Sequence, residues 1–178
     1  MTEDADLIAR VLVDGDHHAF GELVKRHQSL VRGLLRKWMG DDDAQADDLA
    51  QQTFLKAHEK LAQFHGKSSL ATWLCQIAYS KFLMYRRTVR PHAPLDDVPA
   101  AQLARSGDAQ TALRHDLRRA LKNLREEERA AVICCCLQGL THEEASRVLG
   151  WPLGTVKTHV LRGKKALRVQ LAEWAAKG

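Results

Sequence analysis

A basic segment near the C-terminus carries the side chains best suited to bind a polyanion. Between Gly154 and Arg168 the sequence holds five Lys or Arg residues and no acid. Helical spacing turns Val156, Val160 and Leu167 inward and turns the polar residues outward, namely Lys157, Thr158, His159, Arg162, Lys164, Lys165 and Arg168. Lys and Arg donate to guanine edges and to phosphates, and Thr contacts a polar edge or a thymine methyl. The segment therefore indicates a helix that reads duplex DNA in the major groove.

The residues before this segment predict the first helix of a helix-turn-helix. Thr141 to Glu144 reads Thr-His-Glu-Glu, the capping-box form in which a hydroxyl and a carboxylate each accept from the other residue's backbone amide. After the small Ala145 the chain turns at Gly150, and the second helix is expected to begin near Thr155. A run of charge is usually a solvated helix face, but the cap, the turn, the small residue and the basic helix together favour DNA reading.

A second basic cluster lies in the N-terminal half and suits a single strand of nucleic acid. From residue 81 to residue 90 there are four basic residues and no acid, together with Tyr85; the basic residues are Lys81, Arg86, Arg87 and Arg90. Aromatic rings stack on unpaired bases, and cations attract the phosphates between them. Trp73 precedes this cluster, and its position beside Leu74 and Ile77 predicts core packing rather than base stacking.

A polar stripe lies further toward the N-terminus on another predicted helix, where Leu49, Phe54 and Leu55 supply apolar surface. The stripe consists of Asp47, Asp48, Gln51 and Gln52. Taken alone, such a stripe is typical of a solvated helix face.

Apolar residues recur at helical spacing almost throughout the chain, so helices must position these side chains. We expect an all-α fold of two small helical domains: residues 1–90 with four helices, a flexible linker at 91–107 that holds three prolines, and residues 108–178 with four more helices. The predicted N-terminal helices are a short first one and then about 17–39, 44–63 and 70–90. The predicted C-terminal helices cover about 109–124, 126–138, 141–149 and 155–175.

Charge and composition narrow the classes of function. Residues 1–90 hold 13 Lys or Arg against 12 Asp or Glu, whereas residues 108–178 hold 13 against 8. An excess of positive charge in one domain is typical of a nucleic-acid partner. No stretch of about 18 apolar residues occurs and the N-terminus is acidic, so we expect a cytoplasmic protein with no membrane insertion.

The sequence lacks the patterns that would indicate an enzyme. It contains no nucleophile motif, no P-loop and no convincing metal-ligand set. Cys75 and the run Cys134 to Cys136 match neither a disulfide framework nor paired metal spacing, so we expect reduced thiols inside helices, with a zinc or redox role beside His142 as the weaker alternative. We therefore expect no enzymatic activity, no catalytic residue, no metal and no cofactor.

Four segments together resemble one family. GKSSLATWLCQIA at 66–78 is similar to the G-x-S-x-x-x-TWL-x-x-IA motif of extracytoplasmic-function (ECF) sigma factors, and residues 139–167 are similar to the promoter-reading end of that family. DDLAQQTF at 47–54 and AFGELVKRH at 19–27 extend the resemblance over nearly the whole chain except the linker. The resemblance implies a transcription initiation factor, not an enzyme, that binds core RNA polymerase and promoter DNA.

The resemblance also implies where each partner binds. The clamp helices of the largest polymerase subunit would receive Asp47, Asp48, Gln51 and Gln52. A flipped base of the minus-ten element and the exposed strand would meet Phe64, Lys67, Ser68, Ser69, Lys81, Tyr85, Arg86 and Arg87. The minus-thirty-five major groove would receive Lys157, Thr158, Leu161 and Arg162, with His159, Lys164 and Lys165 near phosphate.

One position departs from the family pattern. Gln52 stands where an acid is usual, and Thr53 follows where an aliphatic residue is common. A phosphate on Thr53 would add about −1.5 to −2 charge and restore negative character to a surface that meets a basic partner. We hypothesise a Ser/Thr kinase as an activating partner, against the alternative that Gln52 is simply tolerated. An anti-sigma protein is the other candidate regulator.

Two other classes of protein compete with this interpretation. An autonomous helix-turn-helix regulator of the response-regulator type would bind an operator without polymerase, but the TWL-x-x-IA segment and the lack of receiver-like strand and helix alternation speak against it. A helical adaptor or anti-sigma partner would explain the amphipathic helices, yet it would leave the basic segment from Gly154 to Arg168 without a purpose.

Overall fold

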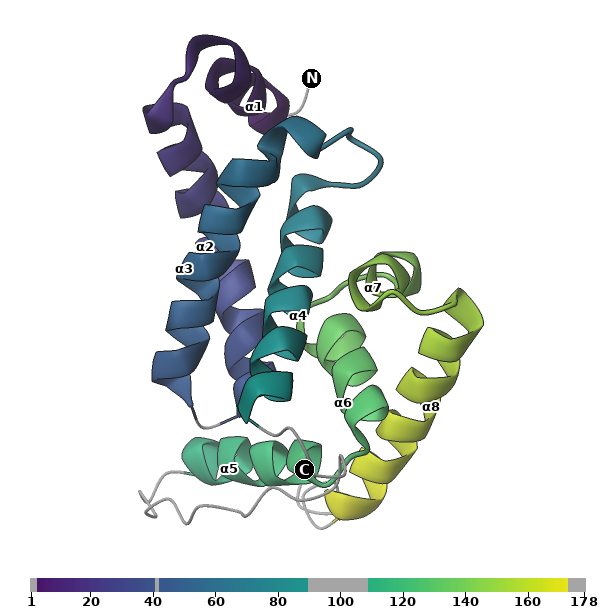
Figure 1. The fold of residues 1–178 in the computed structure, drawn as a ribbon. Helices are drawn as coiled ribbons and strands as arrows, with labels where there is room; N and C mark the ends of the chain where they lie inside the picture. The colour runs from purple at the N-terminus through teal and green to yellow at the C-terminus, as the bar shows by residue number, and fades with distance from the viewer. Residues whose placement is uncertain (1–2, 41, 90–108, 173–178) are drawn as a thin grey trace. The chain divides into compact units, whose positions relative to one another are not determined.

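The computed structural model describes residues 3–40, 42–89 and 109–172, and these ranges are predominantly helical with no strand (Figure 1). They divide into two compact units, with helices α1 to α4 in the first and α5, α6 and α8 in the second. The predicted all-α fold of two small domains is therefore confirmed. The predicted linker at 91–107 lies outside the described residues.

The described part of the first unit consists of α1 (Glu3–Asp14), α2 (His17–Met39), α3 (Asp43–Lys60), the 3-10 helix η1 (Leu61–Gln63) and α4 (Leu70–Val89). Short acidic side chains start two of these helices. Asp16 accepts from the backbone amides of His18 at 2.9 Å and Ala19 at 3.1 Å, and Asp42 accepts from the amide of Gln45 at 3.0 Å. These caps explain why α2 and α3 begin where the sequence predicts.

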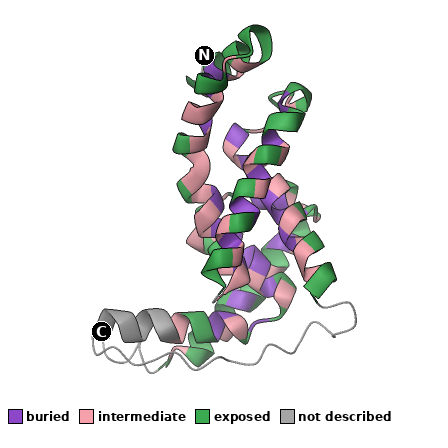
Figure 2. Ribbon diagram, turned by 60° about the vertical axis from the view of Figure 1, so that its left-hand side comes forward, coloured by how far each residue is buried: buried purple, intermediate pink, exposed green. Residues whose placement is uncertain are grey.

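The apolar faces of α2, α3 and α4 form the core of the first unit (Figure 2). Leu34 and Leu35 of α2 are fully buried. One turn further along α2, the ring of Trp38 packs on Tyr79 and Phe82 of α4, with ring centroids 5.0 and 5.5 Å away. This core fixes α3 and α4, whose outer surfaces carry predicted site residues.

The helices after the linker are α5 (Ala109–Lys122), α6 (Glu126–Val132), the π-helical segment η2 (Ile133–Leu137), α7 (His142–Leu149) and α8 (Leu153–Gln170). Leu121, Leu124 and Val132 form a buried cluster, and Leu137 and Leu167 pack against it. Side chains from α5, α6, η2 and α8 therefore share one small core.

The sequence predicts a single helix over 126–138, whereas the structure widens its second half into a π-helix. The backbone amide of Gln138 donates to the carbonyl of Ile133, five residues earlier, at 3.0 Å. In this wider turn the neighbouring Ile133 and Cys134 are both fully buried, while Cys136 is exposed. Apolar periodicity does not distinguish such a turn from an ordinary helix.

Cys75 and Cys134 to Cys136 lie inside helical segments and are not joined in disulfides, as predicted. Burial raises the pKa of the Cys135 thiol to about 11, so this group stays protonated at neutral pH. Within the described ranges, no three His, Cys, Asp or Glu side chains are grouped so that they could hold a metal ion. No helix in those same ranges is long and apolar enough to cross a membrane.

Candidate nucleic-acid interface

A reciprocal cap starts α7, the first helix of the predicted helix-turn-helix. The amide of Glu144 donates to the hydroxyl oxygen of Thr141 at 3.1 Å, and the amide of Thr141 donates to the Glu144 carboxylate at 2.8 Å. The predicted capping box is therefore confirmed. Gly150 then turns the chain with a φ of 70°, a conformation that suits glycine.

α8 begins at Leu153 rather than near Thr155, because Pro152 serves as its N-cap. The amides of Thr155 and Val156 donate to the Pro152 carbonyl at 2.9 and 3.1 Å. Just before this cap, the amide of Trp151 donates to the Ser146 carbonyl at 3.2 Å, and the Trp151 carbonyl accepts from the Ser146 hydroxyl. These bonds fix the point at which α8 leaves the turn.

α8 separates its apolar and basic residues as the sequence predicts. Val156 and Val160 are buried. The exposed side chains are Lys157, Thr158, Leu161, Arg162, Lys164, Lys165 and Arg168. Leu161 exposes 71% of its surface in the middle of this basic face, which suits contact with a thymine methyl between phosphate contacts.

His159 differs from the prediction that it points outward. It is half-buried, and the ring of Trp151 packs on it with centroids 5.5 Å apart. Its Nδ1 atom is enclosed and has no hydrogen-bond partner. Helical periodicity missed this cover because Trp151 reaches His159 from the turn outside the helix, so at most one edge of the imidazole is free for DNA.

The loop between η1 and α4 ends in a second well-defined cap. The Ser69 hydroxyl accepts from the amide of Thr72 at 3.1 Å and lies 2.8 Å from the Thr72 hydroxyl. Lys67 is exposed and Ser68 is half-buried in the loop itself. The cap fixes the start of α4 and thereby the end of the loop that precedes it.

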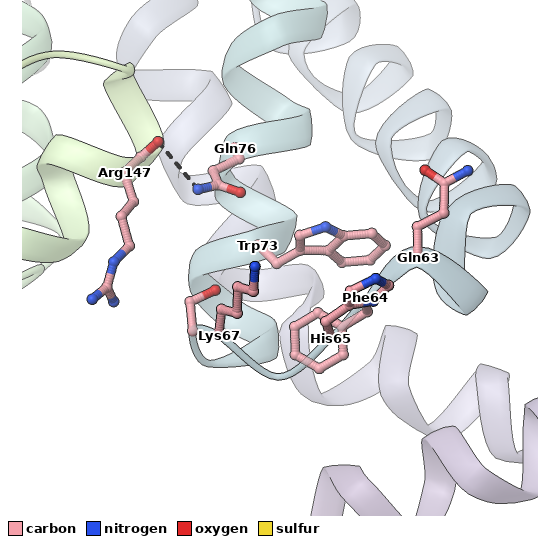
Figure 3. A pocket seen from close by; sticks show the side chains of 8 residues that line it. Gln63, Phe64, His65, Lys67, Trp73, Gln76 and Arg147 are labelled. Carbon is pink, nitrogen blue, oxygen red and sulfur yellow. Dashed lines mark hydrogen bonds between the residues drawn. The ribbon is translucent and has the colours of Figure 1, made fainter.

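An aromatic pair flanks this loop. The half-buried ring of Phe64 lies beside that of Trp73, with centroids 5.4 Å apart and planes at 53° (Figure 3). His65 and Lys67 of the loop lie close by (Figure 3). Trp73 packs less deeply than predicted, because Leu70, Leu74 and Ala78 fill the buried face of α4 and leave Trp73 half-buried at its edge. Its ring therefore lies beside the loop together with that of Phe64.

The described residues of the second basic cluster lie on the C-terminal half of α4, and Arg90 lies outside the described residues. Lys81, Tyr85 and Arg86 are half-buried, and Arg87 is exposed. The Arg86 guanidinium carbon lies 5.7 Å from the centroid of the Phe82 ring, close enough for a cation–π contact. This ring belongs to the core, so the core orients a cation of the cluster.

The polar stripe on α3 contains one residue that is already paired. The carboxylate of Asp47 accepts two bonds from the Arg36 guanidinium, at 3.0 and 3.1 Å, and lies 3.6 Å from Arg32. Both arginines belong to α2, so Asp47 links the two helices. The sequence did not reveal this pair because the partners lie on different helices.

The other residues of the stripe remain on the surface of α3. Asp48 is exposed and accepts from the side-chain amides of Gln52 at 2.6 Å and Gln45 at 3.3 Å. Gln51 is exposed, and Leu55 exposes 67% of its surface one turn further along. This surface of α3 therefore presents neutral and acidic groups beside one exposed apolar side chain.

Thr53 lies on the opposite side of α3 and is completely buried. Its hydroxyl donates to the carbonyl of Leu49, one turn earlier, at 2.7 Å. A kinase would have to open this helix before it could reach the oxygen, and a doubly charged phosphate would then lie in an apolar core. The conformation described therefore does not support the hypothesis of phosphorylation at Thr53.

Comparison with known proteins defines the class of this chain. Residues 23–91 match the family model of Sigma-70 region 2, and residues 114–167 match that of Sigma-70, region 4. The chain is 30% identical to the ECF RNA polymerase sigma-E factor of Haemophilus influenzae, over 92% of this chain and 93% of that protein. It is 35% identical to the ECF RNA polymerase sigma factor SigM of Mycobacterium tuberculosis, over 92% of this chain and 82% of that protein.

Solved structures with a similar fold were also found. The fold is similar to that of CnrH, solved in complex with the cytosolic domain of CnrY, with a TM-score of 0.72 and 24% identity over 96% of this chain and 97% of that one. It is also similar to the sigma factor RpoE of Bartonella quintana, solved with the anti-sigma factor NepR, with a TM-score of 0.65 and 27% identity over 86% and 96% of the two chains. The chain belongs to the ECF RNA polymerase sigma factors.

Proposed function

We propose that this chain binds core RNA polymerase and directs it to promoters, with residues 1–90 holding polymerase and melting the minus-ten element and residues 108–178 reading the minus-thirty-five element. The observation that carries the proposal is the combination, in this order along one chain, of an aromatic loop with a basic helix and a capped helix-turn-helix with a basic face. The chain acts in the cytoplasm as a binding factor, and polymerase performs the chemistry.

The surface of α3 docks on the clamp helices of the largest polymerase subunit. Asp48, Gln51 and Gln52 supply polar groups, and the exposed Leu55 supplies the apolar contact. Asp47 contributes mainly by holding α3 on α2 through Arg36. A small apolar centre within a polar rim is the usual anatomy of a protein interface.

The loop before α4 captures an unstacked base of the minus-ten element. Phe64 and Trp73 offer aromatic surface for the base, and stacking on protein rings offsets the few kcal/mol that a base loses on leaving the duplex. The remaining residues of this site hold the loop or the exposed strand, namely Lys67, Ser68, Ser69, Lys81, Tyr85, Arg86 and Arg87.

The exposed face of α8 reads the minus-thirty-five element. Lys157, Thr158, Leu161 and Arg162 reach base edges, because the first turns of a recognition helix lie deepest in the major groove. Lys164 and Lys165 contact phosphates, together with the one free edge of His159.

Transcription with purified core polymerase tests the proposal. The chain and core are mixed with a library of promoter fragments that core alone does not transcribe, and the transcripts are sequenced. Initiation at defined start sites that need the added chain supports the proposal. Stable binding to DNA with no gain of initiation on core would overturn it and favour the autonomous regulator, which modulates only a complete holoenzyme.

We expect Lys157→Ala and Arg162→Ala each to cost about 1 to 3 kcal/mol of base discrimination, because each removes a donor to a base edge. Base discrimination is measured by competition between a promoter identified in the transcription experiment and single-base variants of its upstream element. Lys164→Ala is the matched control: it should weaken binding about equally on every sequence and lower the slope of log K against log salt by about 0.9. Equal loss on all sequences for Lys157→Ala would reassign that residue to phosphate.

Regulation by phosphorylation is tested on α3 itself. Thr53→Val keeps the buried volume and should leave the affinity for core polymerase unchanged, because the hydroxyl bonds only within its own helix. Gln52→Glu should strengthen binding by about 0.2 to 1 kcal/mol, because it adds an acid to a surface that meets a basic partner.

Kinase-treated wild type that carries phosphate on Thr53 and binds core more tightly would restore the phosphorylation hypothesis. Without that result, we propose sequestration by an anti-sigma protein as the control of this factor.

A further inference from the structure

α8 contains a buried glycine at the point where it crosses α6. Gly163 lies in the interior of the helix and is one of its buried residues. Glycine is among the poorest helix formers because it loses the most backbone freedom on folding. Its position here therefore requires a compensating role.

The close approach of α8 to α6 explains why glycine occupies this position. A Cβ atom added to Gly163 would lie 2.6 Å from the Cγ2 methyl of Val132 and 3.3 Å from the backbone carbonyl oxygen of Glu128. Ordinary contacts between carbon atoms are about 3.5 to 4.0 Å. Val132 is 1% exposed and has a stiff, β-branched side chain, so an added methyl would push α8 away from α6 rather than displace a flexible group.

The crossing point is adjacent to the residues that face DNA. Gly163 follows Arg162 directly, and Leu161 and Lys165 lie two positions away on either side. Because a helix is stiff over so short a distance, a displacement at Gly163 moves all three side chains together. Binding groups work only when held within about 0.5 Å of their productive geometry, whereas relieving a 2.6 Å contact requires a shift of about 1 Å.

We propose that Gly163 is a positioning residue for promoter reading: with Val132 it sets the distance between α8 and α6, and so the depth at which α8 presents its basic face to the major groove. This inference rests on the proposed reading of duplex DNA by α8. It assigns to a residue with no side chain a share of the base discrimination that Lys157 and Arg162 carry out.

The proposal is tested by enlarging the side chain at position 163 on α8 and then reducing the side chain at position 132 on α6. The probe is a duplex selected from a randomised pool by the wild-type chain, both alone and mixed with core polymerase. It is compared with copies that carry single changes in the upstream element. Gly163→Ala should reduce base discrimination about tenfold at a temperature where circular dichroism reports a fully folded chain. Val132→Ala with Gly163→Ala should restore discrimination to within about threefold of wild type, because alanine at 132 removes the obstructing methyl. Gly21→Ala, where an added Cβ meets nothing within 4 Å, is the control.

The outcomes separate this inference from the proposed function. Full discrimination by Gly163→Ala, or a double variant as poor as Gly163→Ala alone, would overturn the role of Gly163. The same duplexes are also measured with the chain alone. A wild type that reads them but never confers initiation on core defeats the sigma-factor proposal and leaves the Gly163 result valid. A wild type that discriminates no duplex in either form defeats both.

Discussion

Replacing both Phe64 and Trp73 by alanine is expected to abolish promoter melting while leaving upstream recognition intact. The two rings pack together beside the loop that precedes α4. Stacking of a base on an aromatic side chain is worth about 1 to 3 kcal/mol per base by alanine substitution, so loss of both rings removes most of the energy that holds an unstacked base. Permanganate reactivity of thymines in the minus-ten element measures the melting.

The control for this experiment is a template that is already open. On a promoter with a mismatched bubble over the minus-ten element, the double variant should initiate much closer to the wild-type rate, because the cost of unstacking has been removed. Binding to the upstream duplex should be unchanged on both templates. Normal melting by the double variant would show that other residues capture the base.

The same substitution at two leucines is expected to give opposite results. Leu35→Ala should destabilise the chain by about 2 to 5 kcal/mol, because this side chain is completely buried between helices and leaves a cavity. Leu55→Ala should change stability by less than about 0.5 kcal/mol, because 67% of its surface is exposed. Urea denaturation followed by circular dichroism measures both.

Binding to core polymerase then separates the two roles. Leu55→Ala should weaken the complex by more than about 1 kcal/mol, as expected of an apolar residue at the centre of an interface. Leu35→Ala should bind normally once the protein is cold enough to be folded. Core affinity unaffected by Leu55→Ala would move the docking surface away from this part of α3.

Much of the fold follows from local chemistry that the sequence displays. Asp16 and Gly40 bound α2 at the predicted residues, and the reciprocal cap of Thr141 and Glu144 marks α7. These caps form between residues close in sequence, so they can be recognised without knowledge of the tertiary structure. The buried positions of α8 follow in the same way from a regular period along one helix.

Three features that the sequence did not reveal arise from contact with a side chain outside the residue's own helix. Trp73 packs on Phe64, which lies in the loop before α4. Asp47 is paired by arginines of α2, and His159 is covered by a tryptophan outside its helix. Each of these partners lies on a different element, so the periodic pattern of one helix does not predict it. The π-helical turn and the Pro152 cap are local, but apolar periodicity does not specify them either.

The ion pair between Asp47 and Arg36 divides the residues of α3 by how freely they can vary. A replacement of Asp47 weakens the link to α2 unless α2 changes as well, because Arg32 would lose its 3.6 Å contact and Arg36 would keep only the 3.9 Å contact with Asp43. Among the described residues, Asp48, Gln51 and Gln52 form no ion pair with another helix, and Asp48 accepts a hydrogen bond from Gln52 within α3. Substitutions at these three positions therefore leave the link between α2 and α3 intact, so on the proposed docking surface a lineage can retune its competition for polymerase without disturbing the architecture.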